Sequence, residues 1–587
     1  MSQKITATHE RVDDIPVIIA QLKKMRVAEL LDHHFPTNGN WTGLSLGWVT
    51  VVWLTFILSE GDHRLYHVEP WVKEHQRTLS RCLGRRVKPR DCTDDRLATV
   101  LDYLSVTENW GEFECALNQH VIRVYHLQAR MARVDSTTVA AFVTPEGLFQ
   151  FGHSKDYRPD LPQLKIAMAA LDPLGLPLTT TVVAGNTADD PLYLPEIAKV
   201  RKIVAITGLT YVGDCKMAAL GTRAAIVAHQ DYSLCPLSAK QMPEAELDRL
   251  LERVWSGAQA LVAVRRPRAA DPTSAEPVDE MDTPIAVGFE DTVEQRAQDQ
   301  SGQMQCWQER RFVVRSLAFA ASQEKSLRQR AVRAVAEINA LNERKQGKKL
   351  LPDAAAARQA AAAIIATHRV AALVHVEVQT ETHEHLKRRY GARPATTVRS
   401  ERVRVSATSD EAALEQAVRR LGWRVYATNH TAEDLRLEQS VAAYRSEYLI
   451  EQGFGRLKGG ALSLSPLFLH YEHRIVGLIY LLTVALRVLV LMQFVVRRNL
   501  QQQGTTLTGI YPGQPGRQTL RPTTEMMLRT FRGVTLSSMT VNGQSFLHLT
   551  PLNEVQQRIL ALLELPLETF SRIVTQLSNS EFHSRET

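Results

Sequence analysis

The chain has 587 residues, 44% hydrophobic and 23% charged, which is the length of a protein with several structural units and the composition of a globular one. Lys and Arg number 70 against 63 Asp and Glu, and this net charge of +7 keeps nucleic acid among the candidate partners without selecting it. The six cysteines include no CxxC pair, which disfavours a disulfide scaffold, a zinc ribbon and a redox pair. The polar N-terminus has no apolar signal segment, so we expect a cytoplasmic protein.

Residues 1–128 are predicted to form a helical N-terminal domain, because apolar residues recur at helical spacing after Asp14 and again later in this part. The run 77–90 between these helices contains six basic residues and no acid, and it includes Arg85 and Arg86. Such a patch can contact phosphates, and a solvated loop explains it equally well.

The following part alternates strands and helices. Residues 129–254 show short apolar strands separated by turns, then helix, strand, helix and strand. This order is that of an α/β ribonuclease-H-like core with a mixed five-stranded sheet, whose last helix would come later in the chain. We assign 255–420 to a large α+β insertion, 421–497 to the second part of the core, and 498–587 to a C-terminal basic extension.

Residues 475–496 form an apolar stretch of 22 residues, long enough to span a bilayer. Arg487 lies near its centre, where a charge is costly in lipid. Basic residues flank both ends, so no charge asymmetry orients the segment. We therefore expect a buried core helix and no membrane association, with a membrane anchor as the alternative.

Three acids stand out by their context. Asp135 is the only acid in its strand, and Asp214 ends another apolar strand that would neighbour the first one in a ribonuclease-H-like sheet. Two adjacent carboxylates repel each other unless a divalent cation neutralises them. Further along, Tyr444, Glu451 and Lys458 are spaced by seven and would lie on one stripe of a single helix. That spacing alone is also typical of a surface helix.

Five segments, in this order, resemble motifs of bacterial insertion-sequence transposases of the DDE class. The branch that they resemble carries a Tyr, Arg, Glu, Lys signature around its third acid. The resemblance extends from about residue 10 to residue 500, and it includes the helical N-terminal region. The segments are VDST at 134–137, FGHSKDYRPDLPQLK at 151–165, GNTADD at 185–190, YVGDCKM at 211–217 and YRSEYLIEQGFGRLKGG at 444–460.

This resemblance implies a transposase that cuts DNA at the terminal inverted repeats of an insertion sequence and joins the 3′ ends to target DNA. Carried over residue by residue, Asp135, Asp214 and Glu451 match the three catalytic acids, which would hold two Mg²⁺ or Mn²⁺ ions. Tyr444 and Lys458 match the signature residues and would contact DNA. The expected partner is double-stranded DNA bound by a homodimer at the bacterial nucleoid, with no small-molecule cofactor.

The resemblance also implies further DNA contacts. His153, Lys155 and Arg158, in the loop between the second and third expected strands, are candidates near the catalytic acids, although a structural hairpin loop explains them almost as well. The N-terminal domain would bind DNA ends, and the insertion would handle them. The tract 487–532 has seven basic residues and one acid, which is compatible with DNA contact, dimerisation or a solvated tail.

The chain departs from the family pattern in two ways. Glu447 stands where the signature has Arg, and Gly453 and Gly455 interrupt the last catalytic helix. These departures leave two alternatives open: a transposase-derived DNA-binding protein that cuts weakly or not at all, and a ribonuclease-H-like nuclease that does not recognise particular ends.

Overall fold

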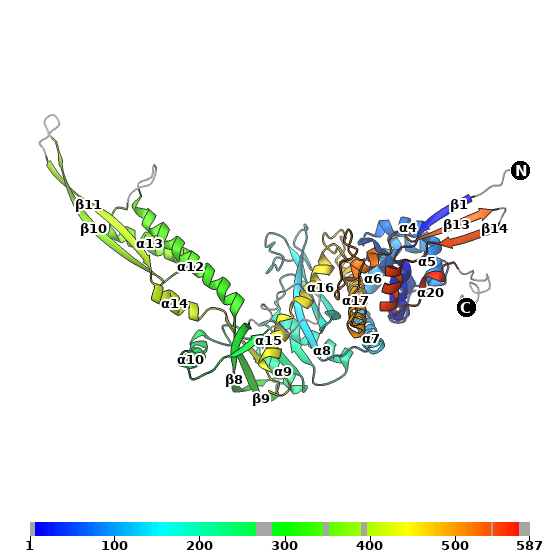
Figure 1. Ribbon diagram of the computed structural model, residues 1–587, viewed down its shortest axis with the longest axis horizontal. Helices are drawn as coiled ribbons and strands as arrows, with labels where there is room; N and C mark the ends of the chain where they lie inside the picture. Colours follow the sequence, from blue (N-terminus) through cyan, green and yellow to red (C-terminus); the bar gives the residue numbers. More distant parts are fainter. Residues whose placement is uncertain (1–5, 266–283, 344–350, 389–395, 542–543, 575–587) are drawn as a thin grey trace.

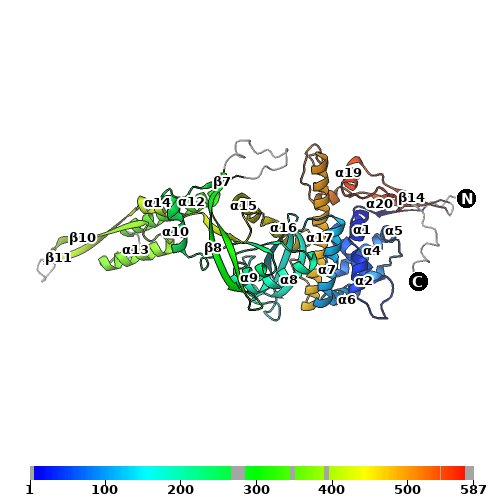
Figure 2. The ribbon, with the colours of Figure 1, turned by 90° about the horizontal axis from the view of Figure 1, so that it is seen from below.

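The computed structural model describes residues 6–265, 284–343, 351–388, 396–541 and 544–574. Figures 1 and 2 show an elongated molecule, with both termini at one end and an arm of helices and a β-ribbon at the other. A large mixed sheet with helices lies between the two ends, so the expected mixed α/β class is confirmed.

The N-terminal part is helical over most of its length, as predicted. The side chains of α3 are apolar on all sides and almost all buried, which is typical of the central helix of a helical unit. The expectation of an all-helical domain is wrong at its start, because β1 (Thr6–Arg11) pairs with β13 (Thr535–Val541), a partner that no local pattern reveals. The helices are α1 (Ile15–Lys24), α2 (Val27–His34), α3 (Leu46–Glu60), α4 (Leu65–Glu74), α5 (Gln76–Leu83), η1 (Pro89–Cys92), α6 (Asp94–Leu104) and α7 (Thr107–Val124).

Asp14, just before α1, is buried and accepts a hydrogen bond from the Ser59 hydroxyl at 2.7 Å. Burial raises its pKa to about 7. The folded protein therefore binds this proton more tightly than the unfolded chain, and its stability falls as the pH rises from about 4 to about 7. We expect Asp14→Asn to raise the free energy of unfolding by about 1–3 kcal/mol at pH 8 and to leave it unchanged near pH 4. Urea denaturation at both pH values measures this, with the exposed Asp94→Asn as the control; an equal effect of Asp14→Asn at both pH values would contradict it.

Nine strands form the central sheet, in the order β4-β3-β2-β5-β6-β12-β9-β8-β7. β2, β3 and β4 are antiparallel neighbours, whereas β5 runs parallel to both β2 and β6. The expected contact between the strand of Asp135 and the strand before Asp214 is thus confirmed. The strands are β2 (Met131–Ala140), β3 (Gln163–Asp172), β4 (Leu176–Ala184), β5 (Thr210–Val212), β6 (Tyr232–Pro236), β7 (Val262–Arg265), β8 (Pro284–Gln298), β9 (Met304–Ser316) and β12 (Trp423–Thr428).

The sheet is larger than the five strands expected. β12 pairs with β6, and β9, β8 and β7 continue the sheet beyond it. Three strands from 255–420, assigned to a separate insertion, are therefore part of the central sheet. Trp423 opposes Arg315 in this pairing, and a contact over such a sequence separation leaves no trace in local hydrophobic patterns.

The helices of this central part return from distant segments of the chain. α8 packs against β2, β3 and β4, and α16 packs against β2 and α17, so a helix from late in the sequence packs on the central sheet as expected. The helices are α8 (Tyr193–Val204, after the short η2, Asp190–Leu192), α9 (Leu220–Ala228), α10 (Glu244–Trp255), α15 (Leu437–Arg445) and α16 (Tyr448–Lys458).

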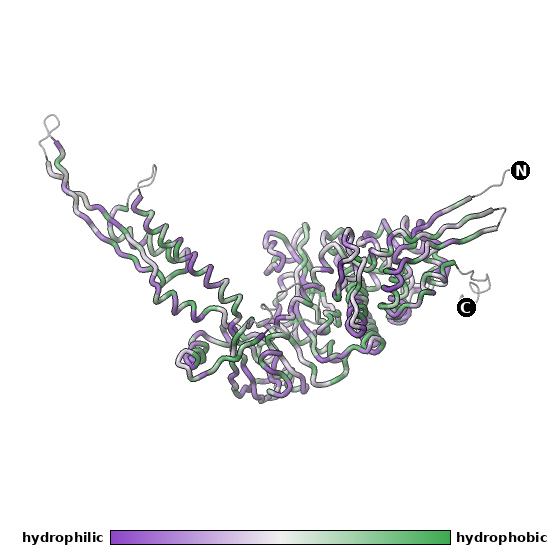
Figure 3. Tube along the Cα trace, viewed as in Figure 1, coloured by the Kyte–Doolittle hydropathy of each residue, from purple (hydrophilic) through white to green (hydrophobic). Residues whose placement is uncertain are grey.

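The projecting arm has a small hydrophobic core of its own, which includes Leu327, Ala331 and Ile338 of α12. Hydrophobic and hydrophilic positions alternate along its helices in Figure 3. Arg328 of α12 pairs with Glu324, Glu411 and Glu415, so the charge of this residue is neutralised within the arm. The arm consists of α12 (Leu317–Asn339), η3 (Ala340–Asn342), α13 (Ala354–His368), β10 (Val374–Lys387), β11 (Thr396–Ser409) and α14 (Glu411–Arg419).

The apolar segment near residue 480 lies within α17 (Glu472–Gln503). Among the described residues, this is the one helix long and apolar enough to cross a membrane, and 94% of its most apolar window is buried within the protein. Arg487 at its centre is fully buried, and its guanidinium lies 2.5 Å from a carboxylate oxygen of Glu114 on α7. Here the helix has protein around it on nearly all sides.

The C-terminal part packs against the N-terminal helices. β13 and β14 (Gln544–Leu549) complete a three-stranded sheet with β1, and α20 (Glu568–Ser571) contacts α1. The remaining helices are α18 (Thr524–Arg529) and α19 (Glu554–Leu562). At the start of the basic tract, Arg497 donates to the Pro522 carbonyl and Arg498 pairs with Glu564, so these two residues do not belong to a solvated tail. DNA contact by this tract stays a prediction.

Candidate active site

Asp135, inside β2, lies level with Asp214, which follows the end of the neighbouring strand β5. Arg133 on β2 opposes Val212 on the parallel strand β5, and each aspartate follows two residues later in its own chain segment. Both line one small pocket together with Glu447. The sequence prediction that these two aspartates come together thus matches their placement.

Asp135 is held in a largely buried position. Burial raises the pKa of its carboxyl group, and the Lys155 ammonium group, 3.1 Å away, opposes that rise. The Ser136 backbone N–H donates to the same carboxylate at 2.7 Å, and Lys155 also donates to the Ser136 carbonyl at 2.6 Å. The ammonium group of Lys155 therefore already compensates the negative charge of Asp135.

Asp214 is fixed by two donors. The Tyr193 hydroxyl, from the start of α8, donates to its Oδ1 at 2.6 Å, and the Lys216 backbone N–H donates to the same oxygen at 2.8 Å. Burial and the neighbouring carboxylate raise the pKa of Tyr193, which keeps its hydroxyl protonated as a donor. Both bonds go to Oδ1, so they leave the Oδ2 atom of Asp214 available.

The expected single stripe of Tyr444, Glu451 and Lys458 is wrong, because two helices replace one. α15 ends at Arg445 and α16 begins at Tyr448. At the break the Glu447 backbone N–H donates to the Tyr444 carbonyl, three residues back, and the Ser446 hydroxyl donates to the Ala442 carbonyl.

This break decides which glutamate faces the aspartates. Glu447 precedes α16, is half-buried and lines the pocket of Asp135 and Asp214, and its pKa is raised first by burial and then by the charge of Asp135. Glu451 lies one turn further, is exposed, and lines an adjacent pocket with Tyr444 and Tyr448. The residue that departs from the family signature is therefore the acid nearest the two aspartates.

Carboxylate oxygens on neighbouring strands are the donors that Mg²⁺ and Mn²⁺ prefer, so the chemistry of this donor set fits a hard divalent cation. Within the residues that the structure describes, no three His, Cys, Asp or Glu side chains are close enough together to hold a metal ion. A three-carboxylate site would require Lys155 to leave Asp135 and a glutamate of the α16 region to approach.

The remaining predicted DNA contacts are placed as follows. Lys458 is tied to the site, because its ammonium group lies 2.5 Å from Asp156 and donates to Thr137 at 2.9 Å. His153 and Arg158 are exposed on the loop that joins β2 to β3. These are the first two strands of the central sheet in the sequence, whereas the loop was expected between the second and third. Arg158 pairs with Asp160. Arg85 and Arg86 follow α5, on the other side of α17 from α16 in Figures 1 and 2.

Sequence reasoning missed a second layer of polar residues beneath Asp135. Asp189 accepts hydrogen bonds from Ser136 and from Lys165, both at 2.8 Å, instead of capping the following helix. Lys165 lies in the family-like segment 151–165, and Asp189 lies in the segment 185–190. Their place in these segments was the signal that could have identified them as site residues. Tyr193 carried no such signal.

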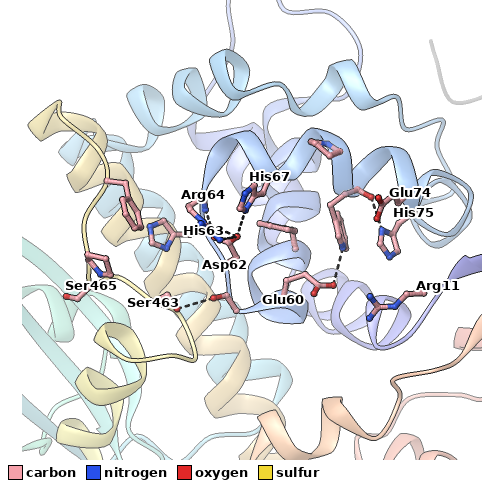
Figure 4. Close-up of a pocket in the computed structure, with 16 residues that line it drawn as sticks. Arg11, Glu60, Asp62, His63, Arg64, His67, Glu74, His75, Ser463 and Ser465 are labelled. Atoms are coloured by element: carbon pink, nitrogen blue, oxygen red, sulfur yellow. Dashed lines mark hydrogen bonds and ion pairs between the residues drawn. The ribbon is translucent and has the colours of Figure 1, made fainter.

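Another pocket separates α4 and the end of α3 from residues 463–468, as Figure 4 shows. Asp62 in this pocket accepts a hydrogen bond from Arg64 at 3.0 Å and contacts His67 at 2.6 Å. None of the acids predicted from the sequence lines it, so the candidate active site remains the edge of β2 and β5.

Comparisons with known proteins give limited information. Residues 7–111, from β1 into α7, match a family model described as a domain of unknown function (DUF4277). No curated protein matches the chain. One similar solved structure is titled "Cryo-EM structure of piggyBac transposase synaptic complex with hairpin DNA (SNHP)", with 10% identity and a TM-score of 0.22 over 51% of this chain and 62% of that one. The match covers less than two thirds of that chain, and a likeness this weak carries no argument about fold or function.

Proposed function

We propose that the protein is a DNA transposase that cleaves phosphodiesters at the ends of an insertion sequence and joins the 3′ ends to target DNA. The observation that carries this proposal is the placement of Asp135 on β2 and of Asp214 just after the parallel neighbour β5, with α16, which carries Glu451, packed against β2. In this proposal β2 to β6 with α8, α9 and α16 form a ribonuclease-H-like core, and two copies act on DNA in the bacterial cytoplasm.

Asp135, Asp214 and Glu451 would hold two Mg²⁺ or Mn²⁺ ions. When bound, these ions would supply charge neutralisation and an activated nucleophile for phosphodiester cleavage. Tyr193 orients Asp214 through its hydroxyl group. Lys155 and Lys458 each pair with a carboxylate now, and both are placed to exchange it for a phosphate of a bound strand.

A DNA-binding protein that no longer cuts is the second candidate. It is favoured by one observation: Glu447, rather than Glu451, lines the pocket of the two aspartates. Such a protein would retain salt-dependent phosphate contacts and show no dependence on a metal ion.

The test is cleavage of labelled DNA that carries the inverted repeats flanking the reading frame, with Mg²⁺, Mn²⁺ or EDTA. We expect cleavage with either metal, none with EDTA, and none with Asp135→Ala or Glu451→Ala; Glu244→Ala, an exposed acid at the start of α10, serves as the control. Cleavage that survives both substitutions would refute the site. Binding without cleavage would favour the non-cutting protein, and cleavage indifferent to the repeats would favour a nuclease.

Tyr193→Phe should weaken Mn²⁺ binding by about 10- to 100-fold, because the variant loses the hydroxyl that orients Asp214. Isothermal titration with Mn²⁺ measures this directly, without any activity assay. Tyr232→Phe, on β6 of the same sheet, is the control and should bind Mn²⁺ like the unmodified protein. Equal affinities for the two variants would show that Tyr193 does not position Asp214 for metal.

A further inference from the structure

We propose that the loop at 141–162 carries an aromatic platform, formed by Phe142 and Tyr157 with Arg158, that stacks on unpaired nucleobases beside the candidate active site. The loop joins β2 to β3 and lies next to α16 (Figure 1). Phe142 is 84% exposed and Tyr157 93% exposed, the two highest values among the large hydrophobic residues that the structure describes. Exposing two rings beside a polar site costs free energy that burial would recover, so their exposure calls for a ligand.

The loop is anchored to the candidate active site immediately before Tyr157. Lys155 contacts Asp135, and its backbone N–H donates to the Thr138 hydroxyl at 3.0 Å. The next residue, Asp156, binds Lys458 of α16. The position of Tyr157 is therefore fixed by both the strand and the helix that would hold the scissile phosphodiester.

The backbone of Tyr157 is strained. Its φ of 57° lies in the left-handed region, which side chains with a β-carbon rarely adopt and which is unusual for a bulky aromatic residue. A glycine at this position would relieve the strain and would remove the ring. Strain retained at an exposed residue next to a candidate active site favours a functional role for its side chain.

The neighbouring residue adds a cation to the platform. The Arg158 guanidinium lies 5.5 Å from the centre of the Phe142 ring, and Asp160 holds it there by hydrogen bonds of 2.8 and 2.9 Å. This contact places Phe142 beside the Tyr157–Arg158 segment, although 15 positions separate the two rings in the sequence. Aromatic faces with an arginine are the combination that holds unpaired bases in proteins that bind single strands.

The occupant follows from this chemistry and from the location. A base within a duplex already stacks on its neighbours and hides its faces, whereas an unpaired base exposes a face that an aromatic ring can cover. A strand held at Asp135 and Asp214 would leave its next bases within reach of the anchored loop. This inference rests on the proposed function in that the nucleic acid is DNA, and it adds that the DNA is locally unpaired when bound.

The experiment measures binding without cleavage. Fluorescence anisotropy in EDTA compares labelled oligo-dT with a duplex of equal length, for the unmodified protein and for the double variant Phe142→Ala, Tyr157→Ala. We expect the affinity for oligo-dT to fall at least about fivefold for each ring removed, and the affinity for the duplex to change less than twofold. Tyr157→Phe keeps the ring and should bind oligo-dT normally, and Tyr66→Ala, an exposed tyrosine on α4, is the matched control.

A second measurement identifies the contact. Oligo-dT containing 5-iodouracil should crosslink to Tyr157 or Phe142 on irradiation, as mass spectrometry of the digested protein would show. Unchanged oligo-dT affinity in the double variant, or an equal loss for the duplex, would overturn the inference. The inference would also be overturned if the double variant sedimented as a smaller species than the unmodified protein and bound oligo-dT with unchanged affinity. That result would assign the two rings to a contact between copies of the chain.

Failure here and failure of the proposed function are distinguishable. If Asp135→Ala abolishes cleavage while the double variant binds oligo-dT normally, the platform is wrong and the transposase proposal stands. If the rings bind oligo-dT and no DNA is ever cut, the platform stands and the transposase proposal fails.

Discussion

Glu114→Ala is expected to lower the free energy of unfolding by about 3–5 kcal/mol, because it leaves the buried charge of Arg487 without its partner. Arg487 is fully buried at the centre of α17, and Glu114 is buried on α7. The guanidinium would keep its hydrogen bonds to the Pro177 carbonyl and the Thr483 hydroxyl, but neither group carries the opposite charge. Urea denaturation followed by circular dichroism measures the loss.

A matched control lies on the same helix. Glu112 pairs with Lys202 at 2.6 Å, and both side chains are more than half exposed. Glu112→Ala should cost less than about 1 kcal/mol, since water and salt screen an exposed pair. Replacing both buried partners, as in Glu114→Leu with Arg487→Met, should recover most of the lost stability. If Glu112→Ala and Glu114→Ala were equally destabilising, the buried pair would have no special role.

Glu451→Gln is expected to lower the rate of DNA cleavage by about a thousandfold or more, equivalent to about 4 kcal/mol of transition-state stabilisation. Glu447→Gln should lower it by no more than about tenfold. The smaller effect follows from the proposed function, in which Glu451 and not Glu447 would hold the cations. Glu451 is exposed in the first turn of α16 and can turn toward the strands without breaking a buried contact.

The two variants are controls for each other. Both replace one carboxylate oxygen by an amide nitrogen, and the two positions are one helical turn apart. Single-turnover cleavage in Mn²⁺ gives the rates, and Mn²⁺ titration shows whether the loss lies in metal binding. A large loss for Glu447→Gln with little loss for Glu451→Gln would assign the third position to Glu447, in agreement with the pocket that this residue lines.

The sequence predicted the parts of the fold that depend on local pattern. The short apolar run around Asp135 identifies β2, and Asp214 follows β5 as expected, because each strand is a short apolar stretch between turns. The buried character of α17 was also predictable, since Arg487 argued against lipid. The partner of Arg487 was not predictable, because Glu114 lies 373 positions away.

The last core helix shows where pattern reasoning fails. Gly453 and Gly455 were expected to loosen it, yet both lie inside α16, and the break occurs earlier at Ser446. A β-carbon on Gly453 would lie 3.5 Å from the Met168 side chain, an ordinary van der Waals contact, so packing does not require glycine there. No local pattern predicts the break between Arg445 and Tyr448. The choice between Glu447 and Glu451 therefore required the structure.

The pairing of β1 with β13 has a consequence for how the protein is made. More than 500 residues are synthesised between residues 6–11 and their partner strand, Thr535–Val541. β1 therefore stays without its partner until β13 has been made, and the unit that both strands complete forms late relative to the strands of the central sheet. A truncated product would carry the acids of the candidate active site without the completed end of the molecule.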